Sequence, residues 1–178
     1  MKAIHEMTLG ELAAFIDTHL REYGINVVLS GGACVAIYSD HQYVSKDLDF
    51  ISQFTIDRAK VETAMKELGF ERRGKYYHCS QTPYFVEFIS GPPFVGQDPI
   101  EEIQEIRMAT GIIRTISPTD SVKDRLAAFY HWGDRQCLEQ AILVSRSNII
   151  DIDKIESWSK REGKMAEFGE YKRRLKRQ

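Results

Sequence analysis

The chain has 178 residues, which is enough for one ordinary domain with or without a small appendage, but not for two full domains. Apolar residues make up 43% and charged residues 28%, which predicts a packed core and excludes both wholesale disorder and a fibrous repeat. The formal net charge of −2 argues against a dedicated DNA-binding domain.

Membrane-spanning and export segments are not predicted. The longest run of apolar and glycine residues is the eight residues 31–38, far short of the roughly 20 that a membrane helix needs. Residues 1–12 have no apolar core followed by a cleavage site, so no signal peptide is expected. Cys34, Cys79 and Cys137 are widely spaced and odd in number, which is typical of reduced thiols. We therefore expect a soluble, cytoplasmic protein with no membrane partner.

The first half of the chain alternates helices and short strands. Residues 8–11 have the spacing of a capping box, and apolar residues recur at helical spacing behind them, which predicts a helix over 9–22. The short β-branched run at 26–29 is typical of a buried strand. The elements predicted after it are a compact helix at 33–38, a strand at 47–51 and a helix at 57–68.

The second half changes from strands to helices. Strands are predicted at 76–79 and 84–89, and isoleucines within 112–116 indicate a further strand. Ser117 and Pro118 have the residue types of a helix N-cap and a first helical position. The helices predicted from there are one that ends at Gly133, one around 138–142, and a last stretch capped by Asp151 or Asp153 and interrupted by Gly163 and Gly169.

Together these elements predict an α+β fold with two regions. A small mixed β-sheet flanked by helices is expected over residues 1–116, and a C-terminal helical region over 117–178. A ligand cleft is expected between the two regions.

One arrangement of polar residues stands above this background. The strand at 26–29 ends in a Ser-Gly-Gly turn at 30–32 and leads into a helix. Asp47 and Asp49 follow, the first of them after 14 intervening residues, and Glu87 lies in the middle of a third strand. Alone, each of these features is usually a turn, a surface pair or an exposed strand residue, but their order and strand context together favour a site.

The chemistry of these residue types explains why they point to phosphate and metal. Two glycines at a strand-to-helix turn let the backbone approach a ligand, and the helix N-terminus offers free N–H groups to a phosphate. Period-two alternation places Asp47 and Asp49 on one face of their strand, which suits Mg²⁺. If the strand of Glu87 lies beside theirs, all three acids converge on one metal centre. By contrast, the pair Asp151 and Asp153 abuts a helix and is assigned to helix capping.

The order and spacing of these residues resemble a known family. Residues 29–32 read LSGG, residues 47–50 read DLDF, and a strand acid follows at Glu87. The pattern resembles the nucleotidyltransferase fold of the DNA polymerase beta superfamily. Within it, the AbiE-type toxin nucleotidyltransferases and their bacterial relatives are the most similar branch, which has a serine where Ser45 stands. The resemblance covers residues 26–52, 84–89 and, more weakly, 120–140.

This resemblance implies an enzyme that transfers a nucleoside monophosphate from an NTP to a hydroxyl group. It implies that Asp47 and Asp49 bind two Mg²⁺ ions that also hold the triphosphate. Glu87 would be the third metal ligand and could serve as the base for the attacking hydroxyl. The residues implied to bind the nucleotide are Ser30, Gly31 and Gly32 around the β and γ phosphates, and Lys123 from the helical half.

The sequence departs from the family pattern in two places. Tyr43 and Val44 stand where an arginine is expected shortly before the acids, and Asp134-Arg135 stands where the order Arg-Asp is expected. These departures bear on the choice of nucleotide and acceptor and leave the three acids untouched.

The acceptor is the part that the sequence defines least. Residues 160–178 carry eight Lys or Arg against three Glu, a local charge of +5 on an otherwise acidic chain. Such a tail can bind RNA phosphates, although a solvated helix face is the commoner explanation. An RNA end, a protein hydroxyl and a small molecule all stay open. The tail and the toxin–antitoxin setting implied by the resemblance favour RNA or a partner protein.

Two alternatives to an active enzyme stay open. One is a catalytically silent nucleotide-binding or antitoxin-type interaction module with the same fold, and the other is an unrelated α+β domain with fortuitous acids. Mg²⁺-dependent thermal stabilisation by NTP, abolished when Asp47 and Asp49 are replaced by alanine, would distinguish the enzyme from both.

Overall fold

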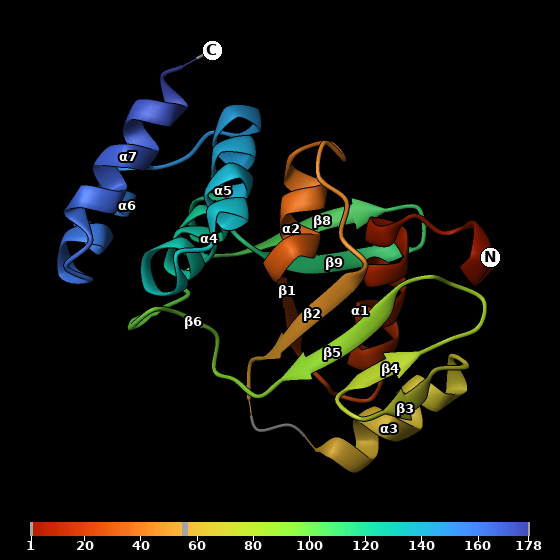
Figure 1. Cartoon of the computed structure of the whole chain (residues 1–178). Coiled ribbons are helices and arrows are strands. Elements are labelled where there is room, and N and C mark those ends of the chain that lie inside the picture. The colour runs from red at the N-terminus through yellow and green to blue at the C-terminus, as the bar shows by residue number, and fades with distance from the viewer. Residues whose placement is uncertain (1, 55–56, 178) are drawn as a thin grey trace.

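A mixed sheet forms the centre of the computed structural model, which describes residues 2–54 and 57–177. The other residues, which fall within the predicted sheet region and basic tail, lie outside this description. Seven strands pair in the order β3-β4-β5-β2-β1-β9-β8 (Figure 1). The β2–β5 and β1–β9 pairs are parallel and the other pairs antiparallel. The strands, including the separate β6–β7 hairpin, are β1 (Val27–Ser30), β2 (Asp47–Ser52), β3 (Glu71–Arg73), β4 (Tyr76–His78), β5 (Phe85–Ile89), β6 (Phe94–Val95), β7 (Asp98–Pro99), β8 (Ile103–Met108) and β9 (Gly111–Ile116).

Helices begin where the sequence supplies capping residues. The Thr8 hydroxyl accepts from the Glu11 N–H, and the Glu11 carboxylate accepts from the Thr8 N–H, which confirms the predicted capping box. Ser117 caps the helix that starts at Pro118, also as predicted. Besides a short 3₁₀ turn (Ile4–Glu6), the helices are α1 (Leu9–Glu22), α2 (Gly31–Tyr38), α3 (Arg58–Glu67), α4 (Pro118–Trp132), α5 (Arg135–Ser147), α6 (Ile152–Arg161) and α7 (Met165–Leu175).

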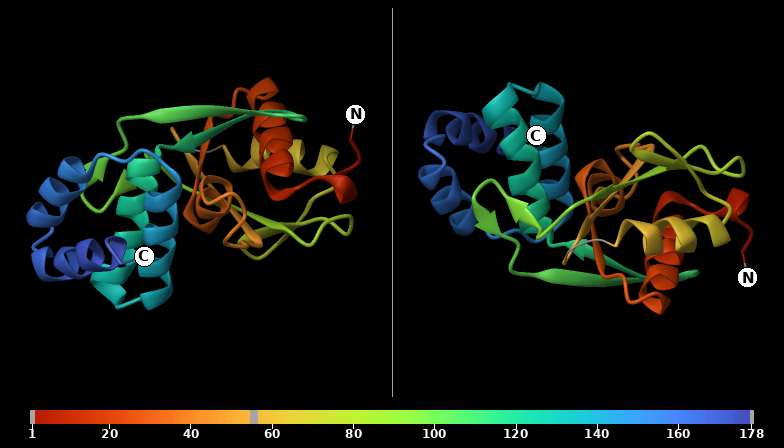
Figure 2. Two further views of the ribbon diagram at one scale, coloured as in Figure 1. Left: turned by 90° about the horizontal axis from the view of Figure 1, so that it is seen from above. Right: turned by 90° about the horizontal axis from the view of Figure 1, so that it is seen from below.

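The helices fall into two groups around the sheet. α1 packs on β9 and β1 and lies beside α3, whereas α2 packs on β2 and reaches α4 and α5. Figure 2 shows α4 to α7 gathered at one end of the molecule, away from the N-terminus. α1 is fixed to β9 by Arg114, whose guanidinium donates to the fully buried Asp17 at 2.7 Å. Within residues 2–54 and 57–177, no helix combines the length and the apolar character needed to cross a membrane.

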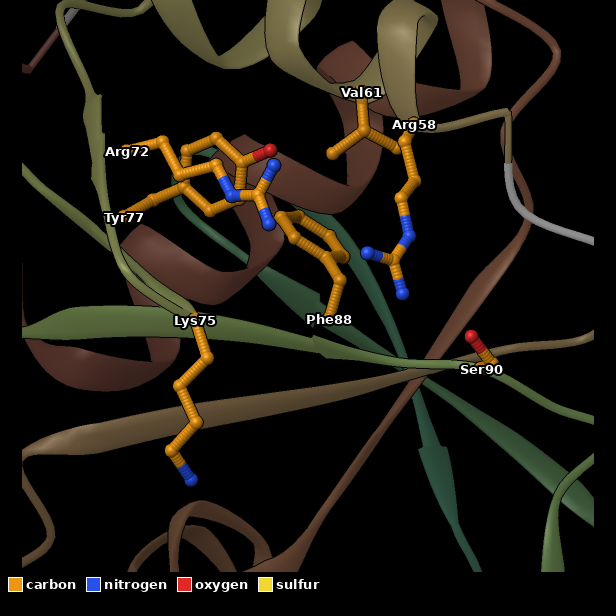
Figure 3. A pocket seen from close by; sticks show the side chains of 7 residues that line it. All are labelled: Arg58, Val61, Arg72, Lys75, Tyr77, Phe88 and Ser90. Atoms are coloured by element: carbon orange, nitrogen blue, oxygen red, sulfur yellow. The ribbon is translucent and has the colours of Figure 1, made fainter.

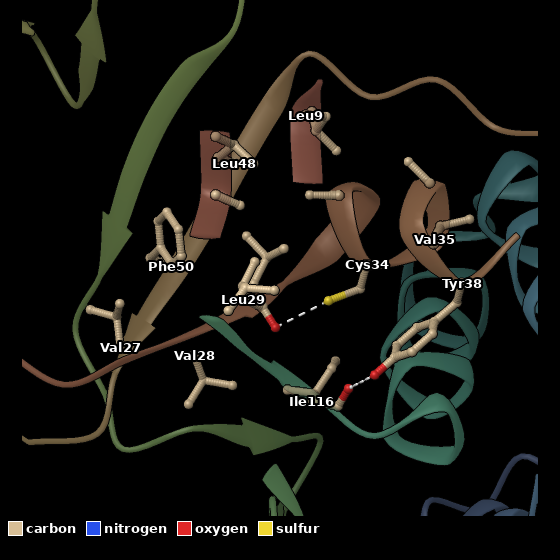
Figure 4. Close-up of a cluster of buried hydrophobic side chains, with 14 of the residues drawn as sticks. Leu9, Val27, Val28, Leu29, Cys34, Val35, Tyr38, Leu48, Phe50 and Ile116 are labelled. Carbon is tan, nitrogen blue, oxygen red and sulfur yellow. Dashed lines mark hydrogen bonds between the residues drawn. The ribbon is translucent and has the colours of Figure 1, made fainter. Parts of the chain in front are cut away.

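The two faces of the central strands differ in character. β2 alternates between buried and half-buried residues, with Leu48 and Phe50 fully buried. Figure 4 shows these side chains packed with Leu29 of β1 in the core. Asp47 and Asp49 lie on the other face, because successive strand residues alternate. β2 pairs with β5 in parallel, which meets the condition on which the expected convergence of the three acids depended.

Three details differ from the expectations. β3, β6, β7 and β8 were not predicted, because these strands are either very short or have little apolar alternation. α2 begins at Gly31, two residues earlier than expected, because glycine lets the chain enter the helix directly from β1. Gly169 lies inside α7 and does not interrupt it, since Phe168 and Tyr171 anchor that helix in the core. β9 ends at Ile116, so the predicted domain division falls between the last strand and α4.

Candidate active site

Two acidic residues face each other across the parallel pair β2 and β5. Asp49 is the register partner of Glu87, and Asp47 lies two residues before it on the same face. Burial, and after it the negative charges of Asp47 and Glu87, raise the pKa of Asp49 to about 6. The three predicted acids are therefore close enough to repel one another.

The Gly-Gly turn brings the start of α2 against these acids. Gly31 has a φ of +67°, and a Cβ built there would lie 2.4 Å from Oδ2 of Asp49. A Cβ on Gly32 would lie 3.1 Å from Oγ of Ser45. The Ser30 hydroxyl donates to the Asp49 carbonyl at 3.3 Å, and it does not cap α2. The first N–H groups of α2 thus lie beside the acids without a side-chain cap, in the position of an anion-binding helix N-terminus.

The segment before β2 orients the first acid. The Ser45 hydroxyl accepts from the Asp47 N–H at 3.3 Å and donates to the Asp47 carbonyl at 3.1 Å. Tyr43, which stands where an arginine was expected, places its ring 3.3 Å from a Cβ built on Gly32. Burial raises the pKa of the Tyr43 phenol, and the Arg125 charge opposes that rise. Tyr43 therefore lies between α2 and the helical region.

Arg125 is the cation that α4 contributes to this site. Its guanidinium donates to the Asp124 carboxylate at 2.6 Å and to Oε1 of Gln140 at 3.4 Å. Its positive charge lowers the pKa of Asp49. Burial alone would lower the pKa of Arg125, but Asp124 and other negative groups raise it above its usual value, so the side chain stays charged.

Lys123, for which the resemblance implied a contact with the triphosphate, is buried and paired with carboxylates. It is 1% exposed, and its ammonium pairs with Asp120 at 3.2 Å and with Asp98 at 3.7 Å. It also lies 5.7 Å from the centroid of the Trp158 ring. These contacts join α4 to β7 and α6, so the Lys123 charge is neutralised within the fold.

Glu87 is also engaged, on the opposite side from Asp49. Nζ of Lys75, in the turn between β3 and β4, donates to Oε2 of Glu87 at 3.0 Å. In the part of the chain that the structure describes, no three His, Cys, Asp or Glu side chains are arranged so that they could hold a metal ion. The convergence of all three acids on one metal centre stays a prediction, and in this structure Lys75 provides a positive charge at Glu87.

The remaining donors nevertheless fit a divalent cation. Mg²⁺ prefers carboxylate oxygens, and Asp47 and Asp49 provide them side by side. A cation would relieve the repulsion that raises the pKa of Asp49. The absence of a side chain on Gly31 keeps open the space next to the Asp49 carboxylate.

Three residues of this site escaped the sequence reasoning. Arg125 comes three residues after Val122 and four residues before Phe129, so it lies on the same face of the helix as these apolar residues. This spacing is the signal that could have predicted that Arg125 faces the rest of the protein. Tyr43 was noted only as a departure from the family pattern. Lys75 has no local signal, because only the β3–β4 turn brings it to Glu87.

Comparison with solved structures gives the class of this fold. The structure of an antigenic nucleotidyltransferase-like protein from Paracoccidioides brasiliensis is similar with a TM-score of 0.58 and 15% identity, over 76% of this chain and 74% of that chain. The chain thus has a nucleotidyltransferase-type α+β fold, and that prediction is confirmed.

The similarity to one antibiotic-resistance factor extends further along the chain. The solution structure of ANT(2″)-Ia has a TM-score of 0.53 at 15% identity, over 92% of this chain and 97% of that chain. The crystal structure of ANT(2″)-Ia in complex with adenylyl-2″-tobramycin has a TM-score of 0.52 at 14% identity, over 89% and 94%. No family model and no curated protein matches the sequence. The AbiE-type branch stays a prediction.

Proposed function

We propose that the chain is a Mg²⁺-dependent nucleotidyltransferase that transfers a nucleoside monophosphate from an NTP to a hydroxyl acceptor. One observation carries the proposal: Asp47, Asp49 and Glu87 occupy one face of two parallel neighbouring strands, next to the uncapped start of α2. The nucleotidyltransferase-type fold supports it.

Each acid has a role in this proposal. Asp47 and Asp49 would supply the carboxylate oxygens for two Mg²⁺ ions, with Glu87 as the third ligand. When bound, the ions would polarise the α-phosphate and neutralise the departing pyrophosphate. Glu87 would accept the proton of the attacking hydroxyl after its carboxylate has left the ion pair with Lys75 and contacts the substrate. Glu87 lies beside Asp49 in register, and this supports its role as a base next to acids that would bind the metal.

The triphosphate would bind between α2 and α4. The N–H groups at Gly31 and Gly32 would donate to the β and γ phosphates, and Ser30 would hold the turn through its bond to β2. Arg125 takes the place that the resemblance gave to Lys123, because it keeps its charge and acts on Asp49. A planar guanidinium also suits a phosphate better than a point charge does.

An RNA end or a protein hydroxyl is the acceptor that we favour, in keeping with an AbiE-type role in a toxin–antitoxin system. A hollow on the α5 and α7 surface is lined by Arg135, Arg173, Arg174 and Arg177 together with Glu170. This excess of guanidinium groups suits a polyanion. Carboxylates neutralise part of the basic tail, in pairs formed by Arg161, Lys164, Lys172 and Arg174.

A catalytically silent nucleotide-binding module is the second candidate, and the ion pair of Lys75 with Glu87 favours it. If that pair persists when NTP and Mg²⁺ bind, the third acid is withheld from the metal. The protein would then bind nucleotide without transferring it.

Transfer of radiolabel tests both candidates. The purified protein would be incubated with Mg²⁺ and each of four α-³²P-labelled NTPs, with total cell RNA or with cell lysate. Label in RNA or in a protein band, lost in Glu87→Ala and retained in Asp153→Asn, would support the enzyme. Asp153 is the matched control because it belongs to the second Asp-x-Asp of the chain, at the start of α6. Nucleotide binding without transfer would favour the silent module, and absence of both would refute the proposal.

A further inference from the structure

A small cavity lies on the face of the sheet opposite the acids. It has a volume of about 90 Å³ and lies between α3 and the β4–β5 hairpin. Val61, Tyr77 and Phe88 form its apolar wall, while Arg58 and Arg72 reach over it from two sides (Figure 3). We call it the arginine pocket. Phe88 follows Glu87 directly in β5, so the two side chains point to opposite faces.

Hydrogen-bond donors without acceptors characterise the arginine pocket. Nε of Arg72 donates to the Gly74 carbonyl at 3.0 Å, which fixes the guanidinium and leaves its two terminal nitrogens unused. Within residues 2–54 and 57–177, no carboxylate oxygen lies within 4 Å of Arg72 or Arg58. Asp57, the neighbour of Arg58, accepts from the first N–H groups of α3 instead.

The charges around the pocket leave a positive excess. Both arginines lower the pKa of the Tyr77 phenol, which burial raises, and Glu62 is the carboxylate that opposes them. Lys75 also lines the cavity, but its ammonium crosses to the other face and pairs with Glu87 (Figure 3).

A comparison within the same hairpin shows that exposure alone does not explain the unpaired arginines. Arg73 is the next residue of β3 and is also exposed, yet it pairs with Glu71 at 3.8 Å. Arg72 instead points to the side of Tyr77, its register partner on β4. Both guanidinium groups that line the cavity thus lack a carboxylate partner among the described residues.

We propose that the arginine pocket binds one phosphate group, as orthophosphate or as the terminal monoester of a larger ligand. Two guanidinium groups can each donate paired hydrogen bonds to phosphate oxygens. The Tyr77 phenol is a third donor at the pocket wall. A cavity of about 90 Å³ is far below the roughly 300 Å³ of a cleft that encloses a drug-sized ligand, so it takes a compact group and not a whole nucleotide.

Titration with orthophosphate, monitored by NMR, tests the site directly. The full chain is labelled with ¹⁵N and titrated at constant ionic strength in EDTA. The EDTA removes metal ions, so that phosphate cannot bind through a metal at the acids. We expect saturable shifts at the Gly74 amide and at Nε of Arg72. Arg58→Gln and Arg72→Gln should each weaken binding about tenfold or more, because charge-assisted bonds to phosphate are lost. Arg73→Gln, the matched control, should leave the affinity unchanged.

Two further arms identify the source of the phosphate and exclude the proposed active site. The first arm compares orthophosphate with an RNA trinucleotide that carries either a 5′-phosphate or a 5′-hydroxyl. Tighter binding of the 5′-phosphorylated RNA than of orthophosphate, with no binding of the 5′-hydroxyl RNA, would indicate that the ligand is a terminal monoester. Equal affinities would indicate the free ion. Arg125→Gln should not change the shift at Gly74. The proposal is overturned if no saturable shift occurs up to ~50 mM phosphate, or if Arg73→Gln weakens binding as much as Arg72→Gln does.

Discussion

Replacing Asp49 with asparagine should stabilise the metal-free protein at neutral pH while removing its function. Burial, and then the charges of Asp47 and Glu87, raises the pKa of Asp49 from 3.8 to about 6. Because the folded state holds the proton more tightly than the unfolded state, the stability from this group is full below pH ~4 and is lost as the pH rises through about 6. Asparagine carries no charge to bury.

The size of the effect follows from the shift. Two pKa units correspond to about 3 kcal/mol. Asp49 is only partly buried, so solvent screening reduces this figure, and we expect Asp49→Asn to raise the free energy of unfolding by about 1–3 kcal/mol at pH 8. No hydrogen bond contributes to the shift, so the amide should lose no stabilising contact among the described residues.

Urea unfolding in EDTA at pH 4 and pH 8 measures this difference. The gain should be large at pH 8 and should nearly vanish at pH 4, where the wild-type carboxyl is increasingly protonated. Asp153→Asn, a change of the same type at an exposed position, should alter stability little at either pH. An Asp49→Asn protein less stable than wild type at pH 8, or a gain that is independent of pH, would refute the reasoning.

Three further substitutions probe the neighbours of the acids. Gly24→Ala should destabilise the protein by ~1 kcal/mol, because an alanine is strained at this positive φ. Gly31→Ala should cost at least ~1 kcal/mol more, since its new Cβ would also meet the Asp49 carboxylate. Thermal melts of the two variants compare these losses of stability. Arg125→Gln should weaken NTP binding about tenfold and raise the pKa of Asp49 further, measured by calorimetry and by NMR titration. Lys123→Met should destabilise the fold by about 3–5 kcal/mol, because it leaves the buried Asp120 carboxylate without its ion pair. The NTP affinity of the folded fraction should stay unchanged. Weaker NTP binding in Lys123→Met, with unchanged binding in Arg125→Gln, would return the phosphate contact to Lys123.

Local signals were sufficient for most of the fold. The capping box at Thr8 and the N-cap at Ser117 are chemical signals within one turn, and both helices begin where these residues predict. The pairing of β2 with β5 was only a condition at that stage, because nothing local in the sequence defines which strands are neighbours. β8 could not be found in this way, since its residues alternate between exposed and half-buried, and among the described residues it pairs with β9 at the edge of the sheet.

The cations of the site could not be predicted, because each one depends on tertiary packing. Lys123 and Arg125 lie two residues apart on α4, so they point to different sides of the helix. The sequence does not show which side faces the acids, and the choice is made by β7 and α6, which enclose Lys123. Lys75 reaches Glu87 from a turn 12 residues away.

The energetics of the acidic face argue for a function there. Gly31 adopts a left-handed conformation against the Asp49 carboxylate, and Asp49 is held among like charges in a partly buried position. The burial of Asp49 among like charges costs stability, and neither arrangement provides a contact that holds the fold together. The fold is held by other groups, among them the buried pair of Asp17 with Arg114 and the Lys123 cluster. A bound cation would relieve the repulsion among the acids, and a triphosphate would fill the open space beside Gly31, so both features would favour ligand binding. A module that binds only through its helices would be more stable without these two features.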